Sequence, residues 1–213
     1  FNEYELKMGS IQTIMAGTGE TLATVNKYLE ELNTYSDKTI YSFKDMTDNI
    51  GKFTNAGVKL DDAVNAIKGI ANEAAVSGAN ANEASRAMYN FSQALSSGYV
   101  KLIDWKSIEN ANMATVEFKK TLLEVADGLG TVKKNADGTY DSLTVNAQGK
   151  ASEAFNAMKG FNDSLQAQWM NTEVLTKALK IYATDVRDLT EDEKKLYEQE
   201  LASIGISPEQ IQK

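Results

Sequence analysis

The chain has 213 residues, 42% of them hydrophobic, so it is long enough to bury one sizeable core. Its 22 basic and 30 acidic residues give a net charge of -8, which repels phosphate backbones and argues against direct binding of nucleic acid. Cysteine and histidine are absent, which excludes disulfides, thiolate metal sites and cysteine nucleophiles and removes the commonest general base, so ordinary hydrolases are disfavoured.

The chain begins at Phe1 and shows no basic segment followed by an apolar run, the pattern of a secretory signal. We therefore expect it to be part of a longer gene product. Every helical pattern carries charges within a turn or two, so no stretch approaches the roughly 18 uninterrupted apolar residues that cross a bilayer. We expect no membrane-spanning segment within these residues.

Apolar residues spaced three and four apart predict two helices near the start of the chain. The first covers about residues 20–35, and its predicted buried face consists of Leu22, Val25, Leu29 and Leu32. The second covers about residues 43–55 and ends before Gly57.

Two longer helical patterns follow, over residues 60–74 and 81–95. Gly78 separates them and supplies the positive φ that commonly ends a helix. Because the connection is so short, we expect the two helices to pack as an antiparallel hairpin. Their alanines permit close approach of the helix axes, whereas Met88 and Phe91 fill the wider part of the seam.

A capped short turn is predicted over residues 104–109, followed by a helix over residues 114–127. That helix has Phe118, Leu122 and Val125 on one face. The glycine pair at positions 128 and 130 is expected to interrupt it.

The pattern then changes from helix to strand. Asp137-Gly138 lies between two β-prone segments, which predicts one β-hairpin within residues 131–148. The same turn resembles the middle of an EF-hand calcium loop, but Lys133 and Thr144 stand where that loop needs ligands. We therefore interpret it as a plain turn.

Helical patterning resumes after the hairpin. One predicted helix starts at Asn171 or Thr172, and its buried face consists of Leu175, Ala178, Leu179 and Tyr182. Another opens with a capping box formed by Thr190 and Glu193, ends at Gly205, and buries Leu196, Tyr197, Leu201 and Ile204. A last helix is expected to start at Ser207-Pro208. The predicted fold class is therefore mainly α, with helical hairpins or a bundle and one small β-hairpin near residues 131–148.

Few residues qualify as candidates for chemistry. Asp61 and Asp62 point in different directions around a helix and are expected to act as N-terminal charges. No phosphate-binding glycine loop is present. Trp105 and Trp169 are candidate partner contacts because interfaces favour large aromatic side chains; the alternative, which is the more common role of such residues, is a semi-buried packing anchor. We predict no catalytic, cofactor-binding or metal-binding residue.

Three phrases of the sequence carry a resemblance to a known family. They are SFKDMTDNIGKFTNAGVKLDDAVNAIKGIANEAAVSGA, EASRAMYNFSQALSSGYVKLIDWKSIENANMATVEFKKTLLEVA and WMNTEVLTKALKIYA. The first two, between residues 42 and 126, resemble the tape measure domain near the N-terminus of phage and prophage tail tape measure proteins, and the third resembles a following segment. On this basis residues 1–130 are expected to form a helical tape measure domain, residues 131–148 a β-hairpin insertion, and residues 149–213 a helical continuation of the same module.

The resemblance implies a structural, non-enzymatic component of a phage tail, involved in tail assembly and in determining tail length. The partners it implies are the tail tube, tail-tip or baseplate proteins and tail assembly chaperones, with self-association as a further option. It also implies a location in the virion tail, and in the bacterial host cytoplasm during assembly. Two alternatives stay open: an unrelated helical protein-binding module and a carboxylate-dependent cell-wall hydrolase.

Overall fold

Helices make up nearly all of the regular structure in residues 14–184 and 189–207, which are the residues that the computed structural model describes. This confirms the predicted mainly α fold class. After a short helical segment at residues 14–18, the main helices are α2 (Leu22–Ser36), α3 (Phe43–Asn55), α4 (Leu60–Ser77), α5 (Ala81–Ser97), α6 (Leu102–Asn110), α7 (Val116–Leu129), α9 (Thr172–Ala183) and α10 (Glu191–Ser203). The helix expected to start at Ser207-Pro208 lies outside the described residues apart from Ser207.

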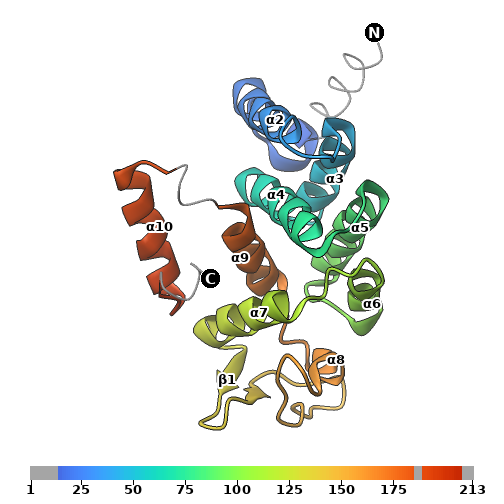
Figure 1. Cartoon of the computed structure of the whole chain (residues 1–213), viewed down its shortest axis with the longest axis vertical. Helices are drawn as coiled ribbons and strands as arrows, with labels where there is room; N and C mark the ends of the chain where they lie inside the picture. The colour runs from blue at the N-terminus through green and yellow to red at the C-terminus, as the bar shows by residue number, and fades with distance from the viewer. Residues whose placement is uncertain (1–13, 185–188, 208–213) are drawn as a thin grey trace.

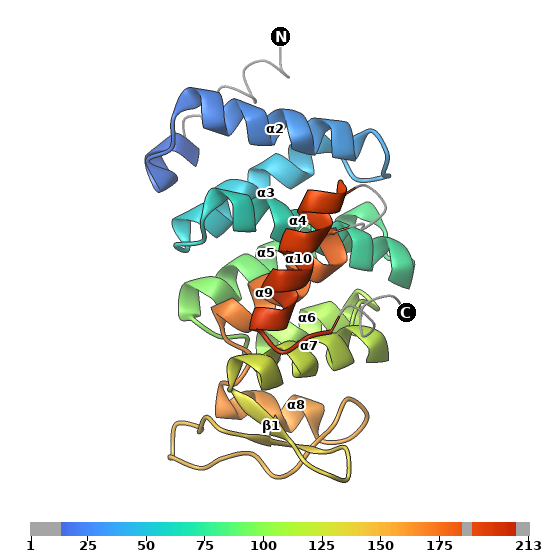
Figure 2. The same cartoon turned by 90° about the vertical axis from the view of Figure 1, so that its left-hand side faces the viewer.

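The helices α2 to α7 follow one another along the long axis of the molecule (Figure 2). The helix α2 lies at one end of this stack, and the β-hairpin that follows α7 lies at the other. The helix α9 returns to the middle of the stack, and α10 lies on the outer side of α9 (Figure 1). The chain therefore brings its later helices back against its earlier ones.

Side-chain caps and glycines set the helix boundaries, as the sequence predicted. The hydroxyl of Ser42 accepts a hydrogen bond from the backbone N–H of Asp45 at the start of α3, and Asn171 caps α9 in the same way. At the start of α10, Thr190 and Glu193 form the expected capping box. Gly78 has a φ of 78° and separates α4 from α5.

The most extensive helix pairing differs from the one expected. The helix α4 does contact α5, but it packs far more extensively on α9. The reason lies at Gly69, where a Cβ atom would sit only 2.2 Å from the carbonyl oxygen of Leu179. Because glycine has no Cβ, the backbones of α4 and α9 approach each other more closely than they could with any other residue at position 69.

Two leucines assigned to buried faces are in fact exposed. The exposed fraction is 50% for Leu22 and 66% for Leu196. Leu22 is the first residue of α2, and Leu196 lies on α10 next to the buried Tyr197, so each falls at the edge of its helix's contact surface. The other predicted residues of these two faces are buried.

Helix lengths were underestimated on either side of residue 112. The predicted short turn over 104–109 is the nine-residue helix α6, in which the Asp104 carboxylate accepts a hydrogen bond from the Lys101 N–H at 3.1 Å. Gly128 was expected to interrupt the next helix but is part of α7, and only Gly130, with a φ of 85°, ends it.

The predicted hairpin is present but shorter than expected. Strands β1 (Val132–Lys134) and β2 (Tyr140–Ser142) pair antiparallel, with Lys133 opposite Asp141. Phe155 adds an isolated bridge to Tyr140 on the far side of β2.

Residues 143–160 contain no helix, so the helical continuation expected from residue 149 begins only at the short helix α8 (Phe161–Ser164). Turns explain this difference. The side-chain oxygen of Asn146 accepts hydrogen bonds from the backbone N–H groups of Gln148 and Lys150, and Asn156 makes a similar turn. A 3-10 turn, η1 (Leu165–Ala167), then follows α8.

Replacing Gly69 with alanine tests the close contact between α4 and α9. The added methyl group would overlap the Leu179 carbonyl, so we expect the free energy of unfolding to fall by about 2–3 kcal/mol despite the better helix propensity of alanine. Asn65→Ala on the same helix is the control and should change stability by less than about 0.5 kcal/mol. Equal stabilities of the two variants in urea denaturation would contradict the proposed role of this glycine.

Candidate functional site

The C-terminal half of α4 carries two polar side chains that contact other helices: Asn72, which is partly buried, and Glu73, which is buried. Asn72 and Glu73 lie within the phrase GIANEAA, which was singled out in the sequence for its resemblance rather than for its chemistry. Glu73 is 1% exposed. Buried polar groups need partners, and each of these two residues finds its partners on other helices.

Asn72 joins three helices. The Tyr35 hydroxyl on α2 donates a short hydrogen bond to the side-chain oxygen of Asn72 and lies 3.2 Å from the carbonyl oxygen of Lys68. The Asn72 amide in turn donates to the backbone carbonyl of Tyr182 near the end of α9, at 2.7 Å. One side chain therefore satisfies groups from both neighbouring helices.

Glu73 connects α4 to the start of α7. The Thr115 hydroxyl donates to the Glu73 carboxylate at 2.8 Å and accepts a hydrogen bond from the backbone N–H of Phe118 at 3.2 Å, which makes Thr115 the N-cap of α7. Burial raises the pKa of Glu73 to about 7; the Thr115 hydrogen bond opposes the rise, and the negative charge of Glu117 adds to it.

Aromatic packing closes the same junction from the side of α9. The ring of Tyr182 stacks on Phe118 of α7 with the ring centroids 5.3 Å apart. Burial raises the pKa of the Tyr182 hydroxyl to about 12, so this phenol stays neutral in the physiological range. The junction of α4, α7 and α9 is the candidate functional site.

A second contact joins two of the phrases that carry the resemblance. The N–H of Val100 donates to the Met170 carbonyl at 2.8 Å, and the N–H of Thr172 donates to the Gly98 carbonyl at 3.2 Å. Between them Tyr99 and Asn171 form an antiparallel bridge. Backbone hydrogen bonds thus join the segment after α5 to the segment before α9.

The two tryptophans proposed as partner contacts are fully buried. Trp105 lies 5.2 Å from Phe161 between ring centroids, and Trp169 meets the same ring edge-on at 5.6 Å. The indole N–H of Trp169 donates to the hydroxyl of Ser164 at 2.9 Å. Their burial supports the alternative interpretation, in which both are packing anchors.

The carboxylates considered in the sequence serve local structure. Asp61 accepts a hydrogen bond from the N–H of Asp62 in the first turn of α4. In the turn of the hairpin, Asp137 accepts from the N–H and the hydroxyl of Thr139, and these bonds lower the pKa of Asp137. Within residues 14–184 and 189–207, histidine, cysteine, aspartate and glutamate form no group of three that could hold a metal ion.

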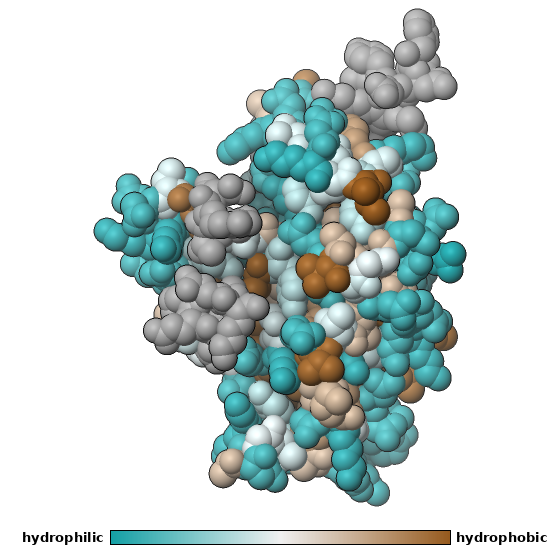
Figure 3. Space-filling model, in the orientation of Figure 1, coloured by the Kyte–Doolittle hydropathy of each residue, from teal (hydrophilic) through white to brown (hydrophobic). Residues whose placement is uncertain are grey.

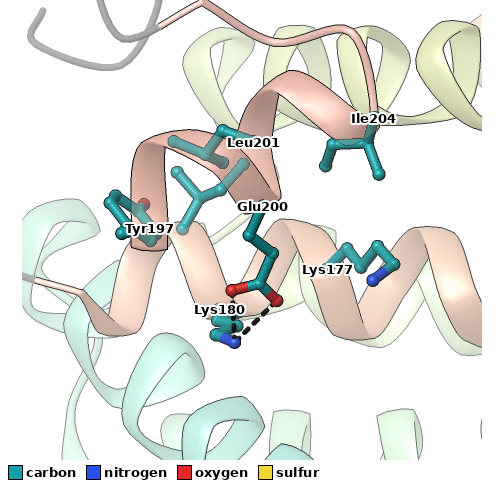
Figure 4. A pocket seen from close by; sticks show the side chains of 7 residues that line it. Lys177, Lys180, Tyr197, Glu200, Leu201 and Ile204 are labelled. Carbon is teal, nitrogen blue, oxygen red and sulfur yellow. Dashed lines mark hydrogen bonds and ion pairs between the residues drawn. The ribbon is translucent and has the colours of Figure 1, made fainter. Parts of the chain in front are cut away.

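The helix α10 packs against α9 through a few side chains, among them Tyr197, Glu200 and Leu201 (Figure 4). Lys180 of α9 donates to both carboxylate oxygens of Glu200, at 2.7 and 2.9 Å. A shallow pocket lies beside this pair between α9 and α10, with a volume of about 10 Å³, close to the least that one water molecule needs. This pocket is too small for a substrate.

Gly128 provides the closest contact between α7 and the end of α10. A Cβ atom at Gly128 would lie 1.4 Å from the carbonyl oxygen of Ile204, and the next residue, Gly205, has a φ of 76°. Two glycines therefore let the turn after α10 rest directly on the backbone of α7.

The visible surface is mostly hydrophilic, with isolated apolar side chains (Figure 3). The most exposed large apolar residues are Ile40, Val76, Ile103 and Met158, each between 74% and 78% exposed. No described helix combines the length and the apolar composition of a membrane span.

Comparisons with known proteins agree with the resemblance. Residues 3–176 match the family described as tape measure protein. The chain is 24% identical over 166 residues to the tape measure protein of Pneumococcus phage Dp-1, which aligns 75% of this chain with 14% of that relative. The chain thus spans a small part of the length of the curated relative that it matches. No solved structure matches the chain significantly.

Asn72→Ala tests the polar connection between α2, α4 and α9. The substitution leaves the Tyr182 carbonyl without this partner and leaves the Tyr35 hydroxyl with the Lys68 carbonyl alone, so the free energy of unfolding should fall by about 1–3 kcal/mol. Asn90→Ala in α5 is a matched control, because the Asn90 amide bonds only to the Arg86 carbonyl of its own helix. If both variants lose the same stability in urea denaturation, the connection across helices contributes nothing.

Gly128→Ala tests how α10 is attached. The new methyl group cannot fit beside the Ile204 carbonyl, so we expect hydrogen exchange to become faster in α10, whereas α4 keeps its protection. The helix α4 serves as the internal control within the same sample. Unchanged protection of α10 would show that the contact at Gly128 is not what holds it.

Proposed function

The chain belongs to the tape measure protein family, and on this premise we propose that it is a folded structural module of a phage tail, part of a longer protein that takes part in tail assembly and in setting tail length. The match over residues 3–176 carries the proposal. The proposed location is the virion tail, preceded by the cytoplasm of the bacterial host during assembly. We propose no catalytic role for this piece.

The contacts made by residues of the three phrases quoted from the sequence support a structural role. Gly69, Asn72 and Glu73 belong to one phrase; the first two contact α9, and Glu73 contacts the start of α7. The other two phrases meet where the segments around Tyr99 and Asn171 pair. These residues are used for packing, which is what a rigid module requires.

The module itself does not have the form of a measuring rod. An α-helix rises about 1.5 Å per residue, so a rod that spans a tail needs a long uninterrupted helix. The longest helix described is α4, with 18 residues, and it ends at Gly78. We therefore propose that length is measured elsewhere in the parent protein and that this module docks to other tail components.

The proposed docking partners are the tail tube, the tail-tip or baseplate proteins and the tail assembly chaperones, together with further copies of the parent protein. The surface is acidic overall, with a net charge of -8 over the whole chain. Partners with basic surfaces would therefore associate faster at low salt than at high salt.

Detection of the parent protein in phage particles tests this function. An antibody raised against the chain would be used to blot particles induced from the source bacterium and purified by sedimentation. Because the aligned region is only 14% of the relative, we expect a band far above 23.3 kDa that sediments with tails. Antibody absorbed with the purified chain controls for cross-reaction. A small protein that is absent from particles would instead favour an unrelated binding module.

A further inference from the structure

Glu73 is a buried carboxyl group that takes part in none of the ion pairs formed within residues 14–184 and 189–207. Those pairs are Lys44 with Asp48, Lys68 with Glu31 and Lys180 with Glu200. The side chain is 1% exposed, and the Thr115 hydroxyl donates to its carboxylate at 2.8 Å. A charged carboxylate in such a place is costly unless it is paired, so the protonation state of Glu73 should matter for packing.

The groups that face Glu73 come from α7 and α9. Glu117, in the first turn of α7, carries a like charge that acts on Glu73. On α9, Glu73 acts on the neutral phenol of Tyr182, which the charges of Glu117 and Glu124 also reach. These neighbours are acidic or neutral, so they favour the protonated form of Glu73.

Thr115 acts in the opposite direction. Its hydroxyl donates to Glu73 and so favours the charged carboxylate, but a single neutral donor replaces only part of the lost hydration. Burial is the larger influence, and the outcome is a pKa of about 7 for Glu73. Near neutral pH the group is therefore close to half protonated.

We propose that Glu73 is a proton-controlled latch: while its carboxyl group is neutral and buried, Thr115 at the start of α7 stays joined to α4, and ionisation draws the carboxyl group toward water and loosens that contact. Thr115 is the link, because it both bonds to Glu73 and caps α7. The helix α7 also packs on β1, so we expect the hairpin to move together with α7. The inference concerns this folded module alone and does not depend on the proposed function.

The direction of the effect follows from proton linkage. The ordinary pKa of a glutamate is 4.5, and the folded value of Glu73 is raised to about 7, so the folded state binds this proton more tightly than the opened state. The resulting stability is fully present below about pH 4.5 and is lost as the pH rises through about 7. Between about pH 5.5 and 7.5 the ratio of the closed state to an opened state, in which Glu73 is hydrated, should fall by a factor of about 20.

Hydrogen exchange in the first two turns of α7 measures this opening. After correction for the intrinsic pH dependence of exchange, we expect protection there to fall by about twentyfold from about pH 5.5 to 7.5 in the unmodified chain. Glu73→Gln keeps the shape but cannot ionise, so its protection should stay constant over the same range. The helix α3, which lies on the far side of α4 from α7, provides the internal reference. The same pH dependence in Glu73→Gln, or none in the unmodified chain, would overturn the latch.

Two further measurements do not depend on the behaviour of Glu73→Gln. Direct NMR titration of the Glu73 carboxyl in the unmodified chain should give a midpoint near pH 7, and a midpoint near the ordinary glutamate value would overturn the proposal. In Thr115→Val, which lacks the bond that favours the charged form, the same titration of Glu73 should give a higher midpoint. A lower or an unchanged midpoint would also contradict the proposal.

Discussion

The close approach of α4 and α9 at Gly69 is the constraint on which the rest of the structure depends. The backbone of one helix meets the Leu179 carbonyl of the other where no Cβ atom would fit. This crossing puts Asn72 one turn further along α4 within reach of the Tyr182 carbonyl, and it places Glu73 where Thr115 can reach it. The polar contacts of Asn72 and Glu73 therefore lie beside a crossing that the missing side chain at Gly69 permits.

The same design appears at the outer helix. Gly128 on α7 and Gly205 after α10 again bring backbone against backbone, while Lys180 and Glu200 fix the side of α10 that faces α9. The contacts differ in extent, since α4 is covered along much of its length whereas α10 is attached at a few points. The result is a well-packed body with a lightly held helix on its surface.

Local signals in the sequence predicted the local features well. Capping residues such as Asn171 and Thr190 and turn glycines such as Gly78 act within a few residues, so they can be recognised without knowledge of the fold. The hairpin at Asp137-Gly138 was predictable for the same reason. The turns led by Asn146 and Asn156 were not recognised: the first begins within the segment predicted as the hairpin, and the second lies where a helix was expected.

Contacts between distant segments were not predictable from periodicity. A helical pattern shows that a face is buried but not which helix covers it, so the pairing of α4 with its neighbour α5 was predicted whereas the more extensive pairing with α9 was not. For the same reason the burial of Trp105, Trp169 and Glu73 could not be decided. One signal was available, because a glycine inside a long helical pattern, as at position 69, costs about 1 kcal/mol relative to alanine and usually has a packing reason.

The pairing of α4 with α9 also determines when the module can fold during synthesis. Asn72 and its partner Tyr182 are 110 residues apart in the chain. At about 5–20 residues per second, a ribosome needs on the order of 5–20 seconds to add that length. During this interval the apolar face of α4 has no α9 to cover it. Completion of the core therefore waits for the synthesis of α9, and the nascent chain carries an open helix face until α9 emerges.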